Sequence, residues 1–159
     1  MLAEILEEPT ALTETLASIG SSCSEIASEL AKERIDLIYF SGSGTSYHAA
    51  LASQYLMSSL SAVPTNSIPA SEFDAWVRAP SANKNVLVAI SQSGESVDVL
   101  SAVETAKKRG IKSVAVTNAP SSSLVKASDF AVLTQAGPEE AVTATKTFVC
   151  CLAASFLLN

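Results

Sequence analysis

The segment VLVAISQSGES, residues 86–96, joins an uninterrupted apolar run to a polar loop. Consecutive apolar residues bounded by turn-forming residues are typical of a strand that is buried on both faces of a sheet. The loop that follows, residues 91–96, contains three serines, a glutamine, a glycine and a glutamate. This change of composition predicts a turn that leaves a buried strand and enters a helix.

The same loop pattern occurs a second time, fifty residues earlier in the sequence. Residues 41–46, SGSGTS, follow the apolar run LIYF at residues 37–40, and both loops read S-x-S-G-x-S. A single serine-rich turn would mean little, because Ser and Gly are common in turns. Two loops with one spacing, each between a strand-like and a helix-like segment, indicate that the two share a role.

Apolar runs alternate with helix-like segments along the whole sequence. We expect strands over residues 36–41, 65–69, 85–91, 112–118 and 129–134. We expect helices over residues 10–32, 46–61, 71–79, 96–109 and 143–158, with a helical turn at 121–128. This alternation predicts an α/β fold of three layers, with a doubly wound, flavodoxin-like, five-stranded parallel sheet. Prolines at both ends of the second strand place it at an edge.

The apolar spacing also predicts which side of each helix is buried. Leu12 and Leu16 belong to the predicted inner face of the first helix, and Val97 to that of the helix over 96–109. Ser71 is the predicted cap of the short helix over 71–79. Trp76, in the same segment, is predicted to be an anchor in the core or at an interface.

The length and composition indicate one domain without a nucleic-acid or membrane function. A protein of 159 residues suits a single domain, with a helical lead-in over about 1–34 and a core over about 35–159. The net charge of −6 argues against a binder of nucleic acid, and no apolar run is long enough to cross a membrane. The mean hydropathy of +0.31 predicts apolar surface that is covered by another subunit or domain.

The cysteines and the N-terminal segment point to a reducing compartment. The three cysteines have neither disulfide nor metal-site spacing, and there is one histidine, so we expect a cytoplasmic protein without a metal. The first residues carry acidic side chains and no basic start, which excludes a signal peptide.

The two serine loops are predicted to hold a phosphate group. Ligands of an open parallel sheet bind at the carboxyl ends of the strands, and a helix N-terminus attracts an anion. Serine hydroxyls add neutral donors, and glycines allow close approach of the backbone. The alternative is that these serines only cap helices. Tyr47 stands where a dinucleotide fingerprint needs its third glycine, and neither a P-loop nor a G-x-S-x-G motif occurs.

Four motifs in order resemble a known family. SGSGTSYHA, PASEF, VLVAISQSGES and AGPEEAVTATKTF together resemble the sugar isomerase (SIS) domain. The sequence is most similar to the first of the two such domains in the isomerase half of glucosamine-6-phosphate synthases. The opening segment EILEEPTALTETL also resembles that family, so the likeness extends over essentially all residues. It implies the N-terminal half of a protein with two SIS domains.

The resemblance further implies a ligand and partners. The ligand is a sugar phosphate of the fructose 6-phosphate or glucosamine 6-phosphate class, and no cofactor is implied. The partner is a second copy in a homodimer or a second SIS domain.

The resemblance also implies roles for individual residues. Phosphate-binding residues carried over by position are Ser46, Ser91, Gln92, Ser93 and Ser96. Sugar-side residues carried over in the same way are Gly44, Thr45, Glu139 and Val142. Thr143 and Ala144 depart from the family pattern, which leaves the exact sugar open. For Lys146, a contact with ligand or loop and a structural ion pair are both open.

The function implied is half of an enzyme site. The resemblance implies a sugar-phosphate isomerase or aminotransferase-like enzyme, acting between ketose and aldose or on amino-sugar phosphates, without a glutaminase domain. The catalytic acid and base of that family have no counterpart in these residues, so we expect them elsewhere. Glu139 and Glu140 could supply a base or be a solvated pair. The alternative function is a non-catalytic module that senses a phosphosugar in a regulator.

Overall fold

The apolar runs form one parallel sheet in the computed structural model, which describes residues 1–77 and 84–158. Its spatial order is β2-β1-β3-β4-β5, and every pairing is parallel. The strands are β1 (Leu37–Gly42), β2 (Thr65–Pro69), β3 (Asn85–Ile90), β4 (Lys112–Thr117) and β5 (Phe130–Leu133). This order confirms the predicted doubly wound, flavodoxin-like fold, with β2 at an edge.

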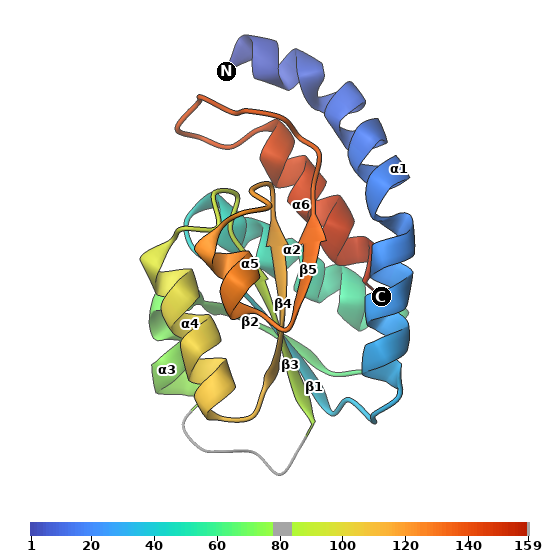
Figure 1. The fold of residues 1–159 in the computed structure, drawn as a ribbon, viewed down its shortest axis with the longest axis vertical. Helices are drawn as coiled ribbons and strands as arrows, with labels where there is room; N and C mark the ends of the chain where they lie inside the picture. Colours follow the sequence, from blue (N-terminus) through green and yellow to red (C-terminus); the bar gives the residue numbers. More distant parts are fainter. Residues whose placement is uncertain (78–83, 159) are drawn as a thin grey trace.

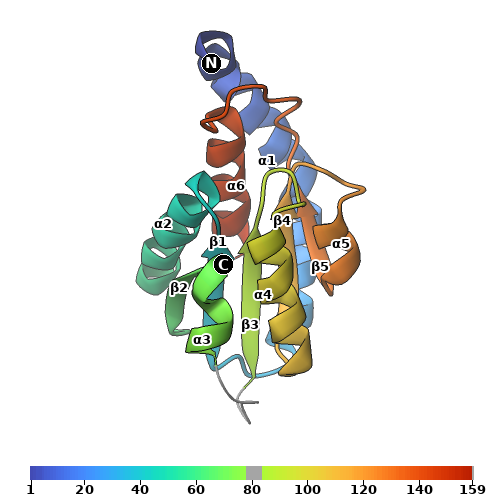
Figure 2. The ribbon, with the colours of Figure 1, turned by 90° about the vertical axis from the view of Figure 1, so that its left-hand side faces the viewer.

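Helices cover both faces of the sheet, as Figures 1 and 2 show. The first group packs on one face and consists of α1 (Leu2–Ala31), α2 (Thr45–Leu60) and α6 (Lys146–Leu157). The second group packs on the other face and consists of the 3₁₀ turn η1 (Ala70–Glu72), α3 (Phe73–Trp76), α4 (Val97–Lys108) and α5 (Ser123–Ala127). None of the helices in the described residues is both long and apolar enough to cross a membrane.

Strand β3 lies at the centre of the sheet, and all six of its residues are buried. Alternate side chains point to opposite faces of a strand. Val86, Val88 and Ile90 therefore belong to the core under α1, α2 and α6, whereas Leu87 and Ala89 belong to the core under α4. This double burial is the reason that the segment is apolar throughout, and it fixes where the following loop begins.

The first helix begins eight residues earlier than predicted, and the N-terminal part of its inner face differs from the prediction. Ala11 and Thr15 are buried, whereas Leu16 is 42% exposed and Leu12 is half-buried. Ala11 packs with Ala136 and Cys150 in a small cluster between α1, the loop after β5 and α6. A close approach of these elements requires a small side chain, so the spacing of the leucines was a wrong guide here.

Two further predictions of side-chain position are wrong, and a third is wrong in part. Val97 is 79% exposed, because it begins α4 on the side away from the sheet, and Val99 faces inward instead. Ser71 lies inside η1, and no side chain caps α3. Trp76 is 67% exposed and donates from Nε1 to Glu72 at 3.1 Å, so it is not in the core, and its place at an interface stays a prediction. The predicted end of that helix, residues 78–79, lies outside the described residues.

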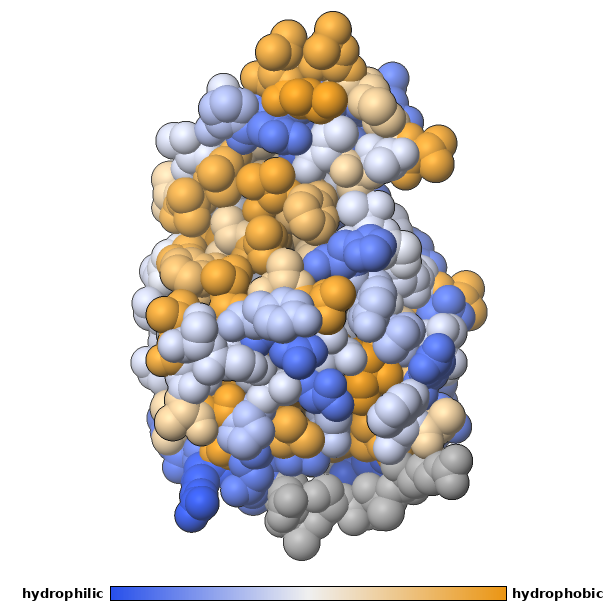
Figure 3. Space-filling view, turned by 180° about the vertical axis from the view of Figure 1, so that it is seen from behind, coloured by the Kyte–Doolittle hydropathy of each residue, from blue (hydrophilic) through white to orange (hydrophobic). Residues whose placement is uncertain are grey.

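Apolar side chains also gather on the outer surface, at the N-terminal end of α1 and on the face that carries α6 (Figure 3). The large apolar residues exposed on these two helices are Leu2, Ile5, Leu6, Leu16 and Phe156. Exposed apolar patches of this kind are typical of surfaces that contact another domain or subunit. That a partner covers them stays a prediction.

Candidate functional site

The two serine loops start side by side at the carboxyl edge of the sheet. Strands β1 and β3 are paired neighbours, and Gly42 of β1 lies opposite Ile90 of β3. The loop over residues 41–46 enters α2, and the loop over residues 91–96 enters α4. Two helix N-termini, each with its partial positive charge, therefore border the same patch of the surface.

The first loop turns tightly into α2. Gly42 is buried, and a Cβ placed there would lie 2.7 Å from the backbone carbonyl carbon and oxygen of Ser46. Gly44 precedes the helix with φ of +55°, a conformation that side chains rarely adopt. The hydroxyl of Ser41 is buried and donates to the carbonyl of Ile68 on β2 at 2.8 Å, so it stabilises the sheet edge.

The second loop is braced by its own serines. Gly94, with φ of +64°, donates its N–H to Ser91 Oγ at 3.1 Å. Ser93 Oγ accepts the N–H of Glu95 at 3.3 Å. Ser91 is buried, whereas Ser93 is exposed. Each hydroxyl accepts in these contacts and keeps its own proton for a ligand.

Glu95 is exposed and bonds to the start of a helix other than its own. Its Oε1 accepts the N–H of Ser123 at 2.8 Å, at the first residue of α5. The hydrogen bonds from Ser123 hold the pKa of the Glu95 carboxyl below its usual range. Its charge is thus directed to a neighbouring helix.

Ser46 and Gln92, one from each loop, meet at a small cavity of about 10 Å³. A space of this size holds about one water molecule. The cavity is lined by residues of both serine loops, of the segment before α6 and of two helices: Thr45, Ser46, Ala49, Gln92, Ala144, Thr147, Phe148 and Cys151. Thr147 and Phe148 were not predicted from the sequence as residues of the site. Their position at the start of a helix, next to the predicted sugar-side loop, could have indicated them.

Several polar side chains here have no partner within the described part of the protein. The structure records no hydrogen bond from the hydroxyls of Thr45 and Ser46 or from the amide of Gln92. Ser96 precedes α4, and its hydroxyl makes no capping bond. All four are only half-buried. These side chains, and the N–H groups of the two helix starts that they leave uncapped, are therefore open to solvent or to a ligand.

A third segment, residues 134–147, closes the site from the side of α6. The carboxylate of Glu139 accepts from Thr145 N and Thr145 Oγ1, both at 2.8 Å, and from the hydroxyl of Thr147. Val142 is fully exposed, and Glu140 is exposed. The sugar contacts expected of Glu139 and Val142 stay predictions. The contacts of Glu139 organise the loop itself and the start of α6.

Lys146 forms a structural ion pair, which is one of the two roles that the sequence left open for it. Its side chain is 4% exposed, and Nζ donates to the carboxylate of Glu7 on α1. The hydrogen bond from Lys146 to Glu7 raises the pKa of the lysine, although burial opposes this. The lysine therefore carries its charge on the α1 side of the segment, whereas the next residue, Thr147, lines the cavity.

The polar side chains that line this cavity are uncharged hydroxyl and amide groups. No charged side chain is among its lining residues in the described ranges, and burial raises the pKa of the Cys151 thiol to about 12. The cavity thus contains no group that could exchange a proton near neutral pH. The hydroxyl, amide and backbone N–H groups beside the two helix N-termini are hydrogen-bond donors of the kind that bind anions.

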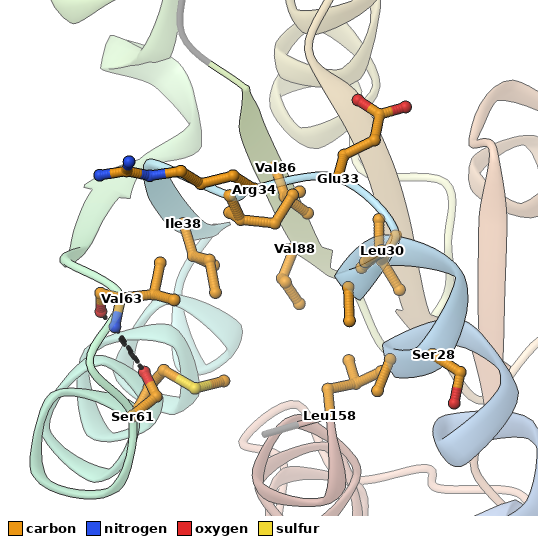
Figure 4. A pocket seen from close by; sticks show the side chains of 15 residues that line it. Ser28, Leu30, Glu33, Arg34, Ile38, Ser61, Val63, Val86, Val88 and Leu158 are labelled. Atoms are coloured by element: carbon orange, nitrogen blue, oxygen red, sulfur yellow. Dashed lines mark hydrogen bonds between the residues drawn. The ribbon is translucent and has the colours of Figure 1, made fainter.

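A much larger cavity, of about 600 Å³, lies at the opposite edge of the sheet (Figure 4). Its walls are mainly apolar and come from the C-terminal ends of α1 and α6 and from the strands, with Leu30, Val86, Val88 and Leu158 among them. It lies at the ends of β1 and β3 remote from the serine loops. Although this cavity is larger than the one between the serine loops, no residue of either serine loop lines it, so it is not the candidate phosphate site.

Comparison with known proteins shows the family of the chain. The profile of the SIS domain family matches residues 29–158. Over 159 residues the chain is 40% identical to glutamine–fructose-6-phosphate aminotransferase (isomerizing) of Aquifex aeolicus, covering 100% of this chain and 26% of that protein. It is 41% identical over 162 residues to the protein of that name from Pyrobaculum aerophilum, with 99% and 26% covered.

A solved structure with a related sequence has the same fold. The C-terminal domain of glucosamine-fructose-6-phosphate aminotransferase from Francisella tularensis superposes with a TM-score of 0.89 at 34% identity. The match covers 99% of this chain and 45% of that one. The chain thus spans about a quarter of the length of the curated relatives and less than half of this solved relative.

Proposed function

The chain belongs to the SIS domain family, and we propose on that premise that its two serine loops bind the phosphate of a hexose phosphate. The observation that carries this proposal is the meeting of Ser46 and Gln92 at one cavity between two helix N-termini. Both side chains lack a partner within the described residues. Helix capping alone would use one hydroxyl per helix, and it leaves these groups unexplained.

The proposed phosphate-binding set keeps the five residues of the sequence analysis. Ser46 and Ser96 contribute hydroxyls at the starts of α2 and α4, and Ser91, Gln92 and Ser93 contribute the loop between them. The proposed sugar side is Gly44, Thr45, Glu139 and Val142, with Glu139 acting through the loop that it holds in place. The ligand class is fructose 6-phosphate or glucosamine 6-phosphate.

The proposed role is that of the phosphate-holding half of a sugar-phosphate isomerase or aminotransferase-like enzyme. The cavity holds no acid or base that titrates near neutral pH, so proton transfer would come from a second SIS domain or a partner copy. In this proposal residues 1–159 act as one SIS domain of a cytoplasmic protein. A sensing module would bind the same ligands. Turnover of fructose 6-phosphate by this chain alone, followed by NMR, would contradict the division of roles.

Ser93→Ala is expected to weaken binding of fructose 6-phosphate about tenfold. The variant removes one hydroxyl donor to a charged ligand, which is worth about 1.5 kcal/mol. Calorimetric titration of fructose 6-phosphate, glucosamine 6-phosphate and free fructose measures the effect, and free fructose should not bind. Ser101→Ala, on the exposed side of α4, is the matched control and should bind as the parent does. Equal affinity of the Ser93 variant and the parent would remove Ser93 from the proposed site.

A further inference from the structure

Three polar side chains of α1 hold the segment 134–147 from the side opposite the cavity. Glu4 Oε1 accepts the N–H groups of Glu140 at 2.6 Å and Ala141 at 3.1 Å. Thr15 Oγ1 accepts the N–H of Gln135 at 3.0 Å. The carboxylate of Glu7 pairs with the ammonium group of Lys146. Contacts from α1 therefore reach the start, the middle and the end of the segment.

Two of the three side chains, Glu4 and Thr15, occupy positions where a helix normally places apolar residues. Glu4 and Thr15 lie on the same buried face of α1 as Ile19, and they are 8% and 0% exposed. Burial of a polar side chain is costly unless it is hydrogen-bonded. Glu4 Oε1 and Thr15 Oγ1 accept hydrogen bonds from this segment, whereas Glu4 Oε2 pairs with the N-terminal ammonium group at 2.6 Å. One carboxylate oxygen of Glu4 and the hydroxyl of Thr15 thus hold the segment against α1.

Apolar packing does not by itself fix the segment at this place. Cavities of about 420 Å³ and 510 Å³ lie beside the Glu7–Lys146 pair, and Glu7, Pro138 and Lys146 line both of them. Where side chains do not fill the space, the position of a segment depends on its polar contacts. The ion pair and the bonds of Glu4 therefore have a large share in setting where residues 138–146 lie.

The position of this segment matters at the cavity. Ala144 and Thr147 line the cavity together with Ser46 and Gln92. Lys146 and Thr147 are consecutive residues in the first turn of α6, so a shift that releases Lys146 from α1 also moves Thr147. The N-terminal part of α1, seen beyond the end of the sheet in Figures 1 and 2, is thus linked to the site through one short segment.

We propose that Glu4, Glu7 and Thr15 of α1 are positioning residues for the sugar side of the site. They act through the segment 134–147 and touch no ligand. The phosphate loops, residues 41–46 and 91–96, are built on β1 and β3, and within the described residues they form no hydrogen bond with these three side chains. Loss of the α1 contacts therefore weakens the binding of a phosphosugar more than the binding of inorganic phosphate. This inference rests on the proposed function.

The test compares Glu7→Gln with the parent protein for two ligands. The variant leaves Lys146 buried without its counter-charge, and a buried unpaired charge is relieved by movement of the segment that carries it. We expect affinity for fructose 6-phosphate to fall about fivefold and affinity for inorganic phosphate to fall by less than about twofold. Both are measured by NMR titration of the Gly94 amide at a temperature where every variant is folded. Glu14→Gln is the control, because Glu14 lies on α1 beside one of the same cavities and is exposed to solvent.

Lys146→Met provides a second route to the same result. It removes the cation together with the ion pair, keeps the length of the side chain, and leaves no buried charge. The same selective loss is expected, together with faster hydrogen exchange at the amides of Glu140 and Ala141. Unchanged fructose 6-phosphate affinity in both variants overturns the inference alone. Equal losses for both ligands also overturn it, since they indicate general damage. A parent protein that binds neither ligand overturns the proposed function and this inference with it.

Discussion

Replacement of Gly42 by alanine is expected to lower the free energy of unfolding by about 3 kcal/mol and to abolish phosphosugar binding. The added Cβ would lie 2.7 Å from the backbone carbonyl carbon and oxygen of Ser46 and 2.9 Å from the backbone nitrogen of Tyr47. These atoms belong to the start of α2 and cannot rotate away. Strand β1 cannot yield either, because β2 and β3 pair with it on both sides. Urea denaturation and fructose 6-phosphate titration measure the two effects.

Gly20→Ala is the matched control for this prediction. Gly20 lies in α1, is exposed, and has no heavy atom within 4 Å of the position of an added Cβ. Alanine inside a helix is more favourable than glycine, so this variant should gain up to about 1 kcal/mol. A Gly42→Ala variant as stable as the parent would show that the turn into α2 can relax, and that the serine loop is less constrained than its geometry indicates.

The sheet and the place of the site follow from local sequence. Four apolar runs and the short segment TNSIP, each bounded by turn residues, indicate five strands. Strand β2 lies at the edge of the sheet, as Pro64 and Pro69 at its two ends predict. Because the strands are parallel and each serine loop follows the carboxyl end of its strand, both loops must lie at the same end of the sheet. The meeting of Ser46 and Gln92 is then a consequence of the strand order, since β1 and β3 are neighbours.

The part of the site formed by α1 and the segment before α6 could not be predicted in this way. Glu4 and Glu140 are 136 residues apart, and no local pattern connects them. The predicted inner face was wrong in the N-terminal part of α1 for the same reason, because the close approach of α6 and Ala136 requires the small side chain of Ala11. From the sequence, Glu139 could be taken for a solvated loop residue. In the structure its carboxylate accepts hydrogen bonds from Thr145 and Thr147.

Glu139→Ala is expected to weaken fructose 6-phosphate binding about thirtyfold, the equivalent of about 2 kcal/mol. The carboxylate is the shared acceptor for Thr145 N, Thr145 Oγ1 and the Thr147 hydroxyl. Its loss leaves these donors without the partner that joins the loop to the first turn of α6, and Thr147 leaves the cavity wall. The loop should open locally before the sheet unfolds. Titration gives the affinity, and limited proteolysis over residues 137–146 detects the opening.

The pH dependence of Glu139 separates a charge effect from a loss of shape. Burial raises the pKa of this carboxyl, but hydrogen bonds from Thr147 and Thr145 outweigh it and leave the pKa below its usual range. A carboxyl whose pKa is lower in the folded state stabilises it fully above its ordinary pKa, and the contribution disappears as the pH falls toward the folded value. Glu139→Gln keeps the shape and one acceptor oxygen without the charge. The difference in unfolding free energy between parent and Glu139→Gln should therefore be constant near neutral pH and shrink in acid. A difference that stays constant through the acid range would show that the charge of Glu139 does not stabilise the loop.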